Sequence, residues 1–425
     1  MTEFTAPGWC NSSNIYEVNL RQYTQEGTCN SFRKHLPRLR DMGVEILWFM
    51  PLTPISLSGR KGTLGSYYAV ADYKKVSTEF GSQQELKELI DDAHAQGFKV
   101  IIDWVANHSG NDNNWIIEHP DYFVHEHEQI LHPNGWDDVS KLNYDNAEMR
   151  EAMLDAMAFW IKEFDIDGYR CDMAHLVPLD FWITARRFLN TIKPGLFWLA
   201  ECEDPAYHAS FDATYTWKWM HASEDFYKQK LPISSLVDVL YAYDRTFTAD
   251  SIRTYFTSNH DENSWNGTEY EKYGEAAKLF AVFSCTWNGI PMVYSGQEIP
   301  NLRRLQFFDK DEMDWSSYSL HLFYKTLLSL HKNNPALRAA DPGVYTEFIQ
   351  NDHPENILSF RRKSGEHEVT VVLNCSEQPN QVHLPLTNSY EEVFLGIHYA
   401  AGAHVLFELE PWGYRVLQRS LLLPA

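Results

Sequence analysis

Cysteine is scarce in this 425-residue chain, and the few cysteines follow no ligand or framework spacing. They are Cys10, Cys29, Cys171, Cys202, Cys285 and Cys375, with no CxxC pair among them. This spacing argues against a zinc ribbon and against a small disulfide-stapled scaffold. We expect six free, buried thiols and a reducing compartment, with a disulfide between Cys10 and Cys29 as the alternative.

Long apolar runs are also missing. No stretch approaches the ~18 apolar residues that a membrane-spanning helix needs. The N-terminal sequence MTEFTAPGWCNSSN lacks the basic region and apolar stretch of a signal peptide. We therefore expect a cytoplasmic protein without a membrane partner, and a leader removed beforehand is the open alternative.

Positive charge is in deficit, with 36 Lys and Arg against 58 Asp and Glu and a net charge of −22. Nucleic acids and anionic membranes are bound through basic patches, so the charge argues against both as partners. A neutral ligand such as a sugar is compatible with it. Aromatic residues make up 14% of the chain, and aromatic faces commonly hold neutral, polyhydroxylated ligands.

Strand-like runs alternate with helical patterns through the first 340 residues. The eight runs are 15–19, 44–50, 99–103, 166–171, 196–200, 211–215, 253–258 and 290–294. Capping boxes at Ser82-x-x-Glu85 and Asp145-x-x-Glu148 are expected to begin two of the helices. This alternation predicts the α/β class and a (β/α)8 TIM barrel.

Two segments depart from the alternation. Residues 109–144, after the third strand, have no regular pattern, and segments of that length inside a domain are usually functional. After residue 341 the pattern changes to short strands without helices, at 357–361, 368–373, 392–395 and 413–417. We predict three domains: a barrel (1–108 and 145–340), a short insertion (109–144) and a C-terminal antiparallel β-sandwich (341–425).

The polar residues at the strand ends predict a site, because the active site of a TIM barrel lies at the C-terminal ends of its strands. These ends carry Asp103 and His108, Arg170 and Asp172, Glu201, and the run Asn259-His-Asp-Glu262. Arg170 and Asp172 are two residues apart on a strand and therefore share a face.

The three carboxyl groups that converge in this way suit the hydrolysis of a glycosidic bond. We expect Arg170 to keep Asp172 ionised as a nucleophile, and the apolar run before Glu201 to raise its pKa as a general acid. Such a pair, roughly 5–5.5 Å apart, is the equipment of a retaining glycosidase. Asp261 is then available to stabilise the oxocarbenium-like charge.

The motifs at these strand ends resemble those of the α-amylase family, glycoside hydrolase family 13. They are DWVANH at 103–108 (DxxxNH), GYRCD at 168–172 (GxRxD), Glu201, NHD at 259–261, and GIPMVYSGQE at 289–298. The resemblance extends along most of the chain. It implies that residues 109–144 are a short domain B and that the residues after 341 are domain C.

The resemblance also implies a role for each matching residue. Asp172 would be the nucleophile, Glu201 the acid/base and Asp261 the stabiliser of the transition state. Substrate would be bound by Asp103, Arg170, His108, His260 and Tyr68, the last stacking beneath the sugar with its neighbour Tyr67 as a competitor.

A metal is not expected. The resemblance implies a structural calcium held by Asn107 and an aspartate of the insertion, but Lys141 stands where that aspartate belongs, and an ammonium cannot ligate a cation. His125, His127 and His132 lack the companion ligands of a metal site and are interpreted as a solvated loop. We therefore predict no cofactor.

Substrate preference is divided between subgroups of the family. VSKLN at 139–143 resembles the MPKLN motif of neopullulanases, cyclomaltodextrinases and maltogenic amylases, while TSNHDEN at 257–263 is closer to ordinary α-amylases. We predict a retaining hydrolase of internal α-1,4 bonds in starch or maltooligosaccharides. The alternatives are a transglycosylase, a neopullulanase- or cyclomaltodextrinase-like hydrolase, and a non-catalytic glucan-binding protein.

Overall fold

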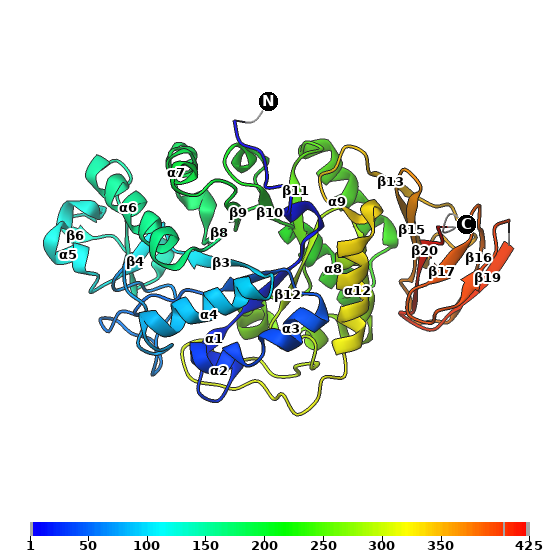
Figure 1. The fold of residues 1–425 in the computed structure, drawn as a ribbon, viewed down its shortest axis with the longest axis horizontal. Coiled ribbons are helices and arrows are strands. Elements are labelled where there is room, and N and C mark those ends of the chain that lie inside the picture. The colour runs from blue at the N-terminus through cyan, green and yellow to red at the C-terminus, as the bar shows by residue number, and fades with distance from the viewer. Residues whose placement is uncertain (1–2, 403, 422–425) are drawn as a thin grey trace.

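A closed ring of eight parallel strands lies at the centre of the larger part of the protein in the computed structural model, which describes residues 3–402 and 404–421 (Figure 1). Around the ring the order is β1-β12-β11-β10-β9-β8-β3-β2. The strands are β1 (Ile15–Val18), β2 (Ile46–Phe49), β3 (Lys99–Trp104), β8 (Gly168–Cys171), β9 (Phe197–Ala200), β10 (Ala213–Tyr215), β11 (Ile252–Tyr255) and β12 (Ile290–Tyr294). The predicted barrel is confirmed.

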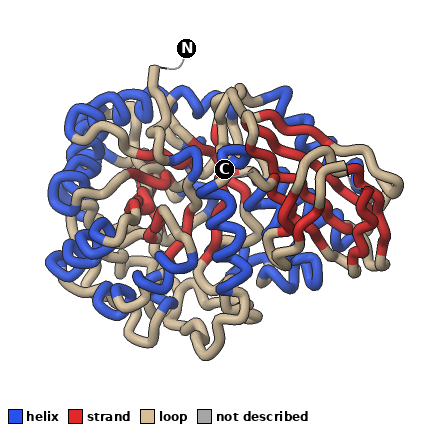
Figure 2. Tube along the Cα trace, turned by 45° about the vertical axis from the view of Figure 1, so that its right-hand side comes forward, coloured by secondary structure: helices blue, strands red, loops and turns tan. Residues whose placement is uncertain are grey.

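Helices surround the ring, as the tube view shows (Figure 2). They are α1 (Leu20–Tyr23), α2 (Cys29–Arg33), α3 (Leu36–Met42), α4 (Gln83–Ala95), α6 (Ala147–Phe164), α7 (Leu179–Ile192), α8 (Trp217–Gln229), α9 (Ile233–Thr246), α10 (Glu269–Tyr273), α11 (Ala277–Thr286) and α12 (His321–Asn333). The fifth unit differs from the expected pattern: within residues 201–212, all described, β9 leads to β10 through the 3-10 helix Pro205–Ala209 and no α-helix.

The start of β8 depends on a glycine. Gly168 has φ 157°, and a Cβ atom there would lie 1.9 Å from the carbonyl oxygen of Phe197 on β9. Only glycine lets the two backbones approach this closely. The ladder with β9 begins at Gly168, so the strand is shorter than the run 166–171 predicted from apolarity.

The capping predictions had different outcomes. Ser82 caps α4 as expected, since its side chain accepts from the Glu85 N–H and Glu85 accepts from the Ser82 N–H. Asp145 is not the cap of α6: the Asn146 side chain accepts from the Met149 N–H at 3.0 Å. Both residues are good N-caps, and the sequence alone does not fix where the helical dihedrals begin.

The insertion between β3 and α6 is more ordered than its sequence indicates. β4 (His108–Gly110) pairs antiparallel with β7 (Val139–Lys141), and β5 (His125–Glu126) pairs with β6 (Gln129–Ile130). A short helix, α5 (Asn114–Glu118), lies between the two ladders in sequence. These strands have only two or three residues, too few to show an alternating pattern.

The C-terminal part is an antiparallel β structure, as predicted. A six-stranded sheet has the order β13-β14-β15-β20-β17-β18, and β16 pairs with β19. The strands are β13 (Tyr345–Phe348), β14 (Ile357–Ser364), β15 (His367–Asn374), β16 (Asn380–Pro385), β17 (Tyr390–Glu392), β18 (His398–Tyr399), β19 (His404–Leu409) and β20 (Tyr414–Arg419). β17 precedes the strand predicted at 392–395, and four of these strands were not predicted. The exact domain boundaries stay predictions.

The two parts are joined through a buried arginine. Arg362 of β14 donates to the carbonyl oxygens of Trp287, Leu337 and Arg338, at 2.9, 3.1 and 2.8 Å. Its side chain is fully buried. In Figure 1 this sheet lies beside α12.

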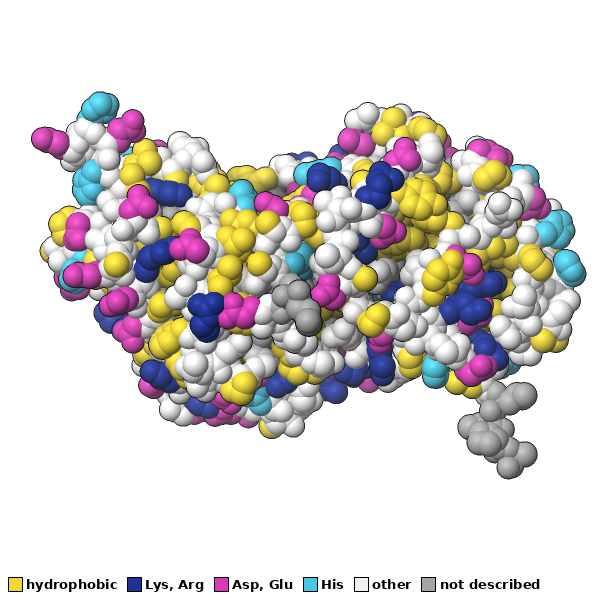
Figure 3. Space-filling model, turned by 90° about the horizontal axis from the view of Figure 1, so that it is seen from above, with side chains coloured by type: hydrophobic (Ala, Val, Ile, Leu, Met, Phe, Trp, Pro, Cys, Tyr) yellow, Lys and Arg dark blue, Asp and Glu magenta, His cyan; other side chains and the backbone are white. Residues whose placement is uncertain are grey.

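Other expectations concern the whole chain. All six cysteines are described, buried and free, so the disulfide alternative is wrong. Within residues 3–402 and 404–421 no helix has the length and apolarity to cross a membrane. Figure 3 shows acidic, basic and apolar side chains interspersed on the face seen from above.

Candidate active site

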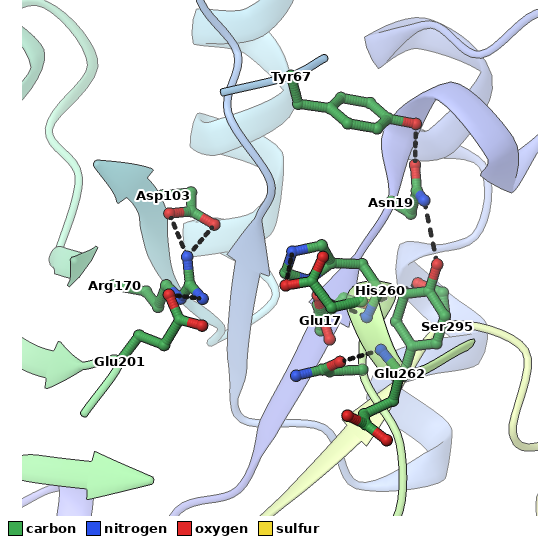
Figure 4. Close-up of polar contacts among 12 residues, drawn as sticks. Glu17, Asn19, Tyr67, Asp103, Arg170, Glu201, His260, Glu262 and Ser295 are labelled. Atoms are coloured by element: carbon green, nitrogen blue, oxygen red, sulfur yellow. Dashed lines mark hydrogen bonds and ion pairs between the residues drawn. The ribbon is translucent and has the colours of Figure 1, made fainter. Parts of the chain in front are cut away.

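Arg170 lies between Asp103 and Glu201, two of the residues that the strand ends bring together (Figure 4). Its Nη1 atom is 2.9 and 3.1 Å from the two carboxylate oxygens of Asp103 and 3.3 Å from Asp172 Oδ1. Its Nη2 atom is 2.8 Å from Glu201 Oε2. The guanidinium lies over the rings of Trp48 and Tyr215, and the side chain has no exposed surface. One cation therefore serves three carboxyl groups.

Asp172 has a pKa well above its ordinary value. Burial is the main cause, followed by the neighbouring carboxyl group of Glu201, while Arg170 acts in the opposite direction. Arg170 thus favours the ionised form of Asp172, as expected, but burial and Glu201 act more strongly in the opposite direction. The reason is geometric: Arg170 is closer to Asp103 and Glu201 than to Asp172.

Met173 fixes the position of Glu201. Its backbone is left-handed, with φ 42° and ψ 44°, a conformation that is unusual for a residue other than glycine. In this conformation the Met173 N–H donates to Glu201 Oε2 at 2.8 Å. Strained backbone of this kind is concentrated at functional sites.

His260 connects the opposite side of the site. Its Nε2 atom is 2.7 Å from the Tyr68 hydroxyl and 3.3 Å from Asp261 Oδ2, and the Tyr68 hydroxyl donates to Asp103 Oδ2 at 3.0 Å. Burial alone would raise the pKa of Asp261, but His260 and Arg170 more than offset it, so this pKa lies below its ordinary value. Asp261 thus differs from Asp172, whose pKa is raised.

His108 is buried beside the insertion. Burial and the nearby Lys141 ammonium lower its pKa to about 3, so the ring is neutral. The ring meets Trp136 edge-on, with 5.5 Å between the centroids. A neutral imidazole can both donate to and accept from a ligand hydroxyl.

A cavity of about 350 Å³ opens over these residues. Its lining comprises Lys61, Ser66, Tyr68, His108, Trp136, Asp138, Val139, Asp172, Met173, Glu201, Asp261, Trp265, Phe307 and Phe308. A second, adjoining hollow is lined by Met173, His175, 201–205, Trp217 and Lys218. Glu201 and Met173 line both, so the two hollows meet at these residues.

The structure separates the aromatic candidates. Tyr68 lines the cavity. The Tyr67 hydroxyl instead donates to Asn19 Oδ1 at 3.0 Å (Figure 4). The Arg21 guanidinium lies over the Tyr67 ring. Trp136 and Trp265 also line the cavity. Trp115 instead packs against Tyr73, with 4.9 Å between the ring centroids.

Comparison with known proteins agrees with this geometry. The α-amylase catalytic domain matches residues 11–139 and 124–315. The chain belongs to the α-amylase family. It is therefore a glycoside hydrolase of that family and acts on α-glucans. The C-terminal domain of maltogenic amylases matches residues 346–416.

Relatives within the α-amylase family carry several names. A cyclomaltodextrinase of Geobacillus thermopakistaniensis is 27% identical over 89% of this chain and 68% of its own. The α-amylase MalA of Haloarcula japonica is 28% identical over 90% of this chain and 58% of its own. Among solved structures, a noncanonic maltogenic α-amylase, AmyB, from Thermotoga neapolitana has a TM-score of 0.88 at 28% identity, covering 97% of this chain and 99% of its own.

The residues at the family's calcium position do not fit a divalent cation here. The Lys141 ammonium donates to Asn107 Oδ1, the amide oxygen that a calcium ion would need. The described residues contain no cluster of three or more His, Cys, Asp or Glu side chains able to hold a metal. His125 and His132 bond instead to the carbonyl oxygens of Phe123 and Val139.

Several residues in or beside the cavity of this α-amylase-family chain were not predicted from the sequence. Phe307 and Phe308 belong to the long segment after β12, where length alone was the available signal. Lys61 crosses to the insertion, bonding Asp138 at 2.9 Å. Glu17, at the end of β1, bonds His260 and could have been found by reading the end of that strand like the others.

Proposed function

We propose that this member of the α-amylase family is a retaining hydrolase that cleaves internal α-1,4 bonds of starch and maltooligosaccharides through a glycosyl–Asp172 intermediate. The observation that carries the proposal is the meeting of two hollows at Glu201 and Met173. A glucan chain can extend to both sides of a bond held there, as internal cleavage requires.

In the first step, Asp172 attacks the anomeric carbon of the sugar in the cavity while Glu201 gives its proton to the departing glycosidic oxygen. A covalent glycosyl–Asp172 ester forms and the sugar on the other side of the bond leaves. In the second step, Glu201 removes a proton from water, and the water oxygen attacks the same carbon and releases Asp172. Two inversions restore the original α configuration.

The raised pKa of Asp172 has a place in this scheme. The site needs one proton, on Glu201, when the substrate is attacked. Burial and the neighbouring carboxyl group of Glu201 raise the pKa of Asp172, and Arg170 opposes them. Attack on the substrate requires Asp172 to be ionised.

Other cavity residues would bind the sugar. Tyr68 offers a ring face beneath it, and stacks against Phe307 with 6.3 Å between the centroids. His108 and His260 would bond hydroxyl groups, while Asp261 would face the positive charge that develops on the ring. Asp103 and Arg170 would hold these residues in place, since Arg170 Nη1 donates to both carboxylate oxygens of Asp103.

The domain boundaries 108/109, 144/145 and 340/341 and a cytoplasmic location are parts of the same proposal. Six free, buried cysteines support a reducing compartment. One relative is named an intracellular maltogenic amylase of Bacillus subtilis, 25% identical over 82% of this chain.

Incubation with maltoheptaose tests the proposal. We expect shorter maltooligosaccharides, with the newly formed reducing ends in the α configuration when they are read by NMR before mutarotation. Products longer than maltoheptaose would favour transglycosylation. An unchanged substrate would contradict the proposal and leave a glucan-binding role.

A second candidate is hydrolysis of cyclomaltodextrins. The match of residues 346–416 to the maltogenic amylase C-terminal domain and the Lys141–Asn107 contact favour it. The same assay with β-cyclodextrin in place of maltoheptaose tests this candidate. Ring opening at a rate equal to or above the cleavage rate of maltoheptaose would favour it. An intact ring would exclude it. Pullulan in parallel reports cleavage of α-1,6 bonds.

A further inference from the structure

Both ring nitrogens of His260 face hydrogen-bond acceptors. Nδ1 is 2.5 Å from Glu17 Oε1, and Nε2 is 2.7 Å from the Tyr68 hydroxyl oxygen and 3.3 Å from Asp261 Oδ2. The hydrogen of the Tyr68 hydroxyl is already directed to Asp103. A carboxylate can only accept, so this arrangement needs a hydrogen on each nitrogen and hence an imidazolium.

Glu17 is built into the barrel rather than into a loop. It lies on β1 with no exposed surface, and its backbone oxygen accepts from the Ser295 N–H at 3.0 Å and the Ser295 hydroxyl at 2.5 Å (Figure 4). Its Oε2 atom has no hydrogen-bond partner in the described part of the chain. A buried carboxyl group with one unpaired oxygen destabilises the folded state, so packing alone does not explain a glutamate at this position.

Burial raises the pKa of Glu17, whereas His260 and Arg170 favour its carboxylate form. Glu17 faces His260 and Arg170, together with the hydroxyl groups of Tyr215 and Tyr294. Asp261 and Tyr68 face the other nitrogen of His260. Burial would lower the pKa of His260, but Asp261 and Glu17 raise it well above its ordinary value.

We propose that Glu17 is a positioning residue: on the proposed function, its carboxylate keeps His260 protonated, so that Nε2–H is presented to the sugar-binding cavity between Tyr68 and Asp261. Glu17 does not touch the substrate. It acts through His260, from which it receives a hydrogen bond on the side of the ring opposite the cavity.

Loss of the proton would rearrange the site. With a neutral ring whose hydrogen stays on Nδ1, the Nε2 lone pair would face the Asp261 carboxylate, which is repulsive. The Tyr68 hydroxyl would turn to donate to Nε2 and would abandon Asp103. A sugar hydroxyl would then meet an acceptor where the wild-type protein offers a donor.

The variant Glu17→Gln tests this. Its amide oxygen can still accept from Nδ1–H, but the balancing charge is gone, so the pKa of His260 falls. We expect the alkaline limb of kcat/KM on maltoheptaose to move to lower pH by about one unit or more, because kcat/KM reports the ionisations of the free enzyme. Below the shifted limb, kcat/KM should approach the wild-type value.

Histidine ¹⁵N NMR gives a readout that does not depend on turnover, with the His260 signal assigned by its loss in His260→Asn. We expect His260 to stay protonated through neutral pH in the wild type and to titrate in Glu17→Gln. The control is Glu79→Gln, which removes a carboxylate paired with buried Arg21 outside the cavity and should leave both profiles unchanged.

A pH-independent fall in activity with an unshifted His260 titration would overturn the proposal and leave Glu17 a structural role. If the wild type did not cleave maltoheptaose, the proposed function would fail while the NMR titration would still decide the state of His260.

Discussion

At the residue scale, the single positive charge of Arg170 is shared among three carboxyl groups. Three carboxyl groups lie within 3.3 Å of its guanidinium, and the closest approaches belong to Asp103 and Glu201. Period-two alternation in the strand correctly places Arg170 and Asp172 on one face. It does not show which acceptor the guanidinium prefers, because that depends on Asp103 and Glu201 from neighbouring strands. The sequence of one strand therefore does not show which side chains from different strands pair inside the barrel.

The variant Asp172→Asn examines the nucleophile directly. The amide keeps the shape of the side chain but cannot attack the anomeric carbon, so we expect kcat on maltoheptaose to fall by about 10⁴-fold or more. Glucan binding, measured by titration calorimetry, should persist. The matched control is Asp180→Asn, which changes an exposed partner of Arg150. Activity within tenfold of the wild type would assign the attack to another group.

At the scale of elements, the strands of the barrel were predicted well and the short strands poorly. Most barrel strands are short, mainly apolar and buried runs, which a sequence pattern can locate even where a charged residue such as Glu17 or Arg170 interrupts them. β4 to β7 and β16 are short or half-exposed, and their pairing is decided by distant partners. The same limit explains the cap of α6, where Asp145 and Asn146 are equally suitable residues.

The ladder between β4 and β7 carries a prediction about metal. Lys141 on β7 donates to Asn107 beside β4, so the ammonium supplies a positive charge inside this element. We expect EDTA to leave the thermal midpoint unchanged, and Lys141→Ala to lower the free energy of unfolding by about 1–3 kcal/mol, because Asn107 loses a charged donor.

Lys74→Ala, which removes an exposed pair with Asp155, is the control for that experiment and should cost little. A large fall of the thermal midpoint in EDTA, reversed by added calcium, would show that a metal holds this region.

On the scale of the whole molecule, Arg362 joins the C-terminal sheet to the barrel. Removing its side chain takes a donor from three carbonyl oxygens, and the contacts with two of them, those of Trp287 and Leu337, are buried. We expect Arg362→Ala to lose about 2–4 kcal/mol of stabilisation, read as a lower urea midpoint, with kcat at low temperature unchanged. Lys363→Ala, at a half-buried neighbour on β14, should change the midpoint much less, because its partner Glu368 keeps its closer contact with Arg361 at 2.8 Å. An unshifted midpoint for Arg362→Ala would mean that the junction is held by apolar packing.

The order of the barrel strands has a consequence for the synthesis of the chain. β1 completes the ring by pairing with β12, and Glu17 and His260 meet across 243 positions of sequence. A ribosome that has released the chain as far as Asp261 has therefore delivered every acidic group of the site, yet the ring that aligns them is still open, because β12 begins only at Ile290. Hydrolytic activity should therefore appear in one late step, after β12 has left the ribosome and Ser295 can donate to the backbone oxygen of Glu17.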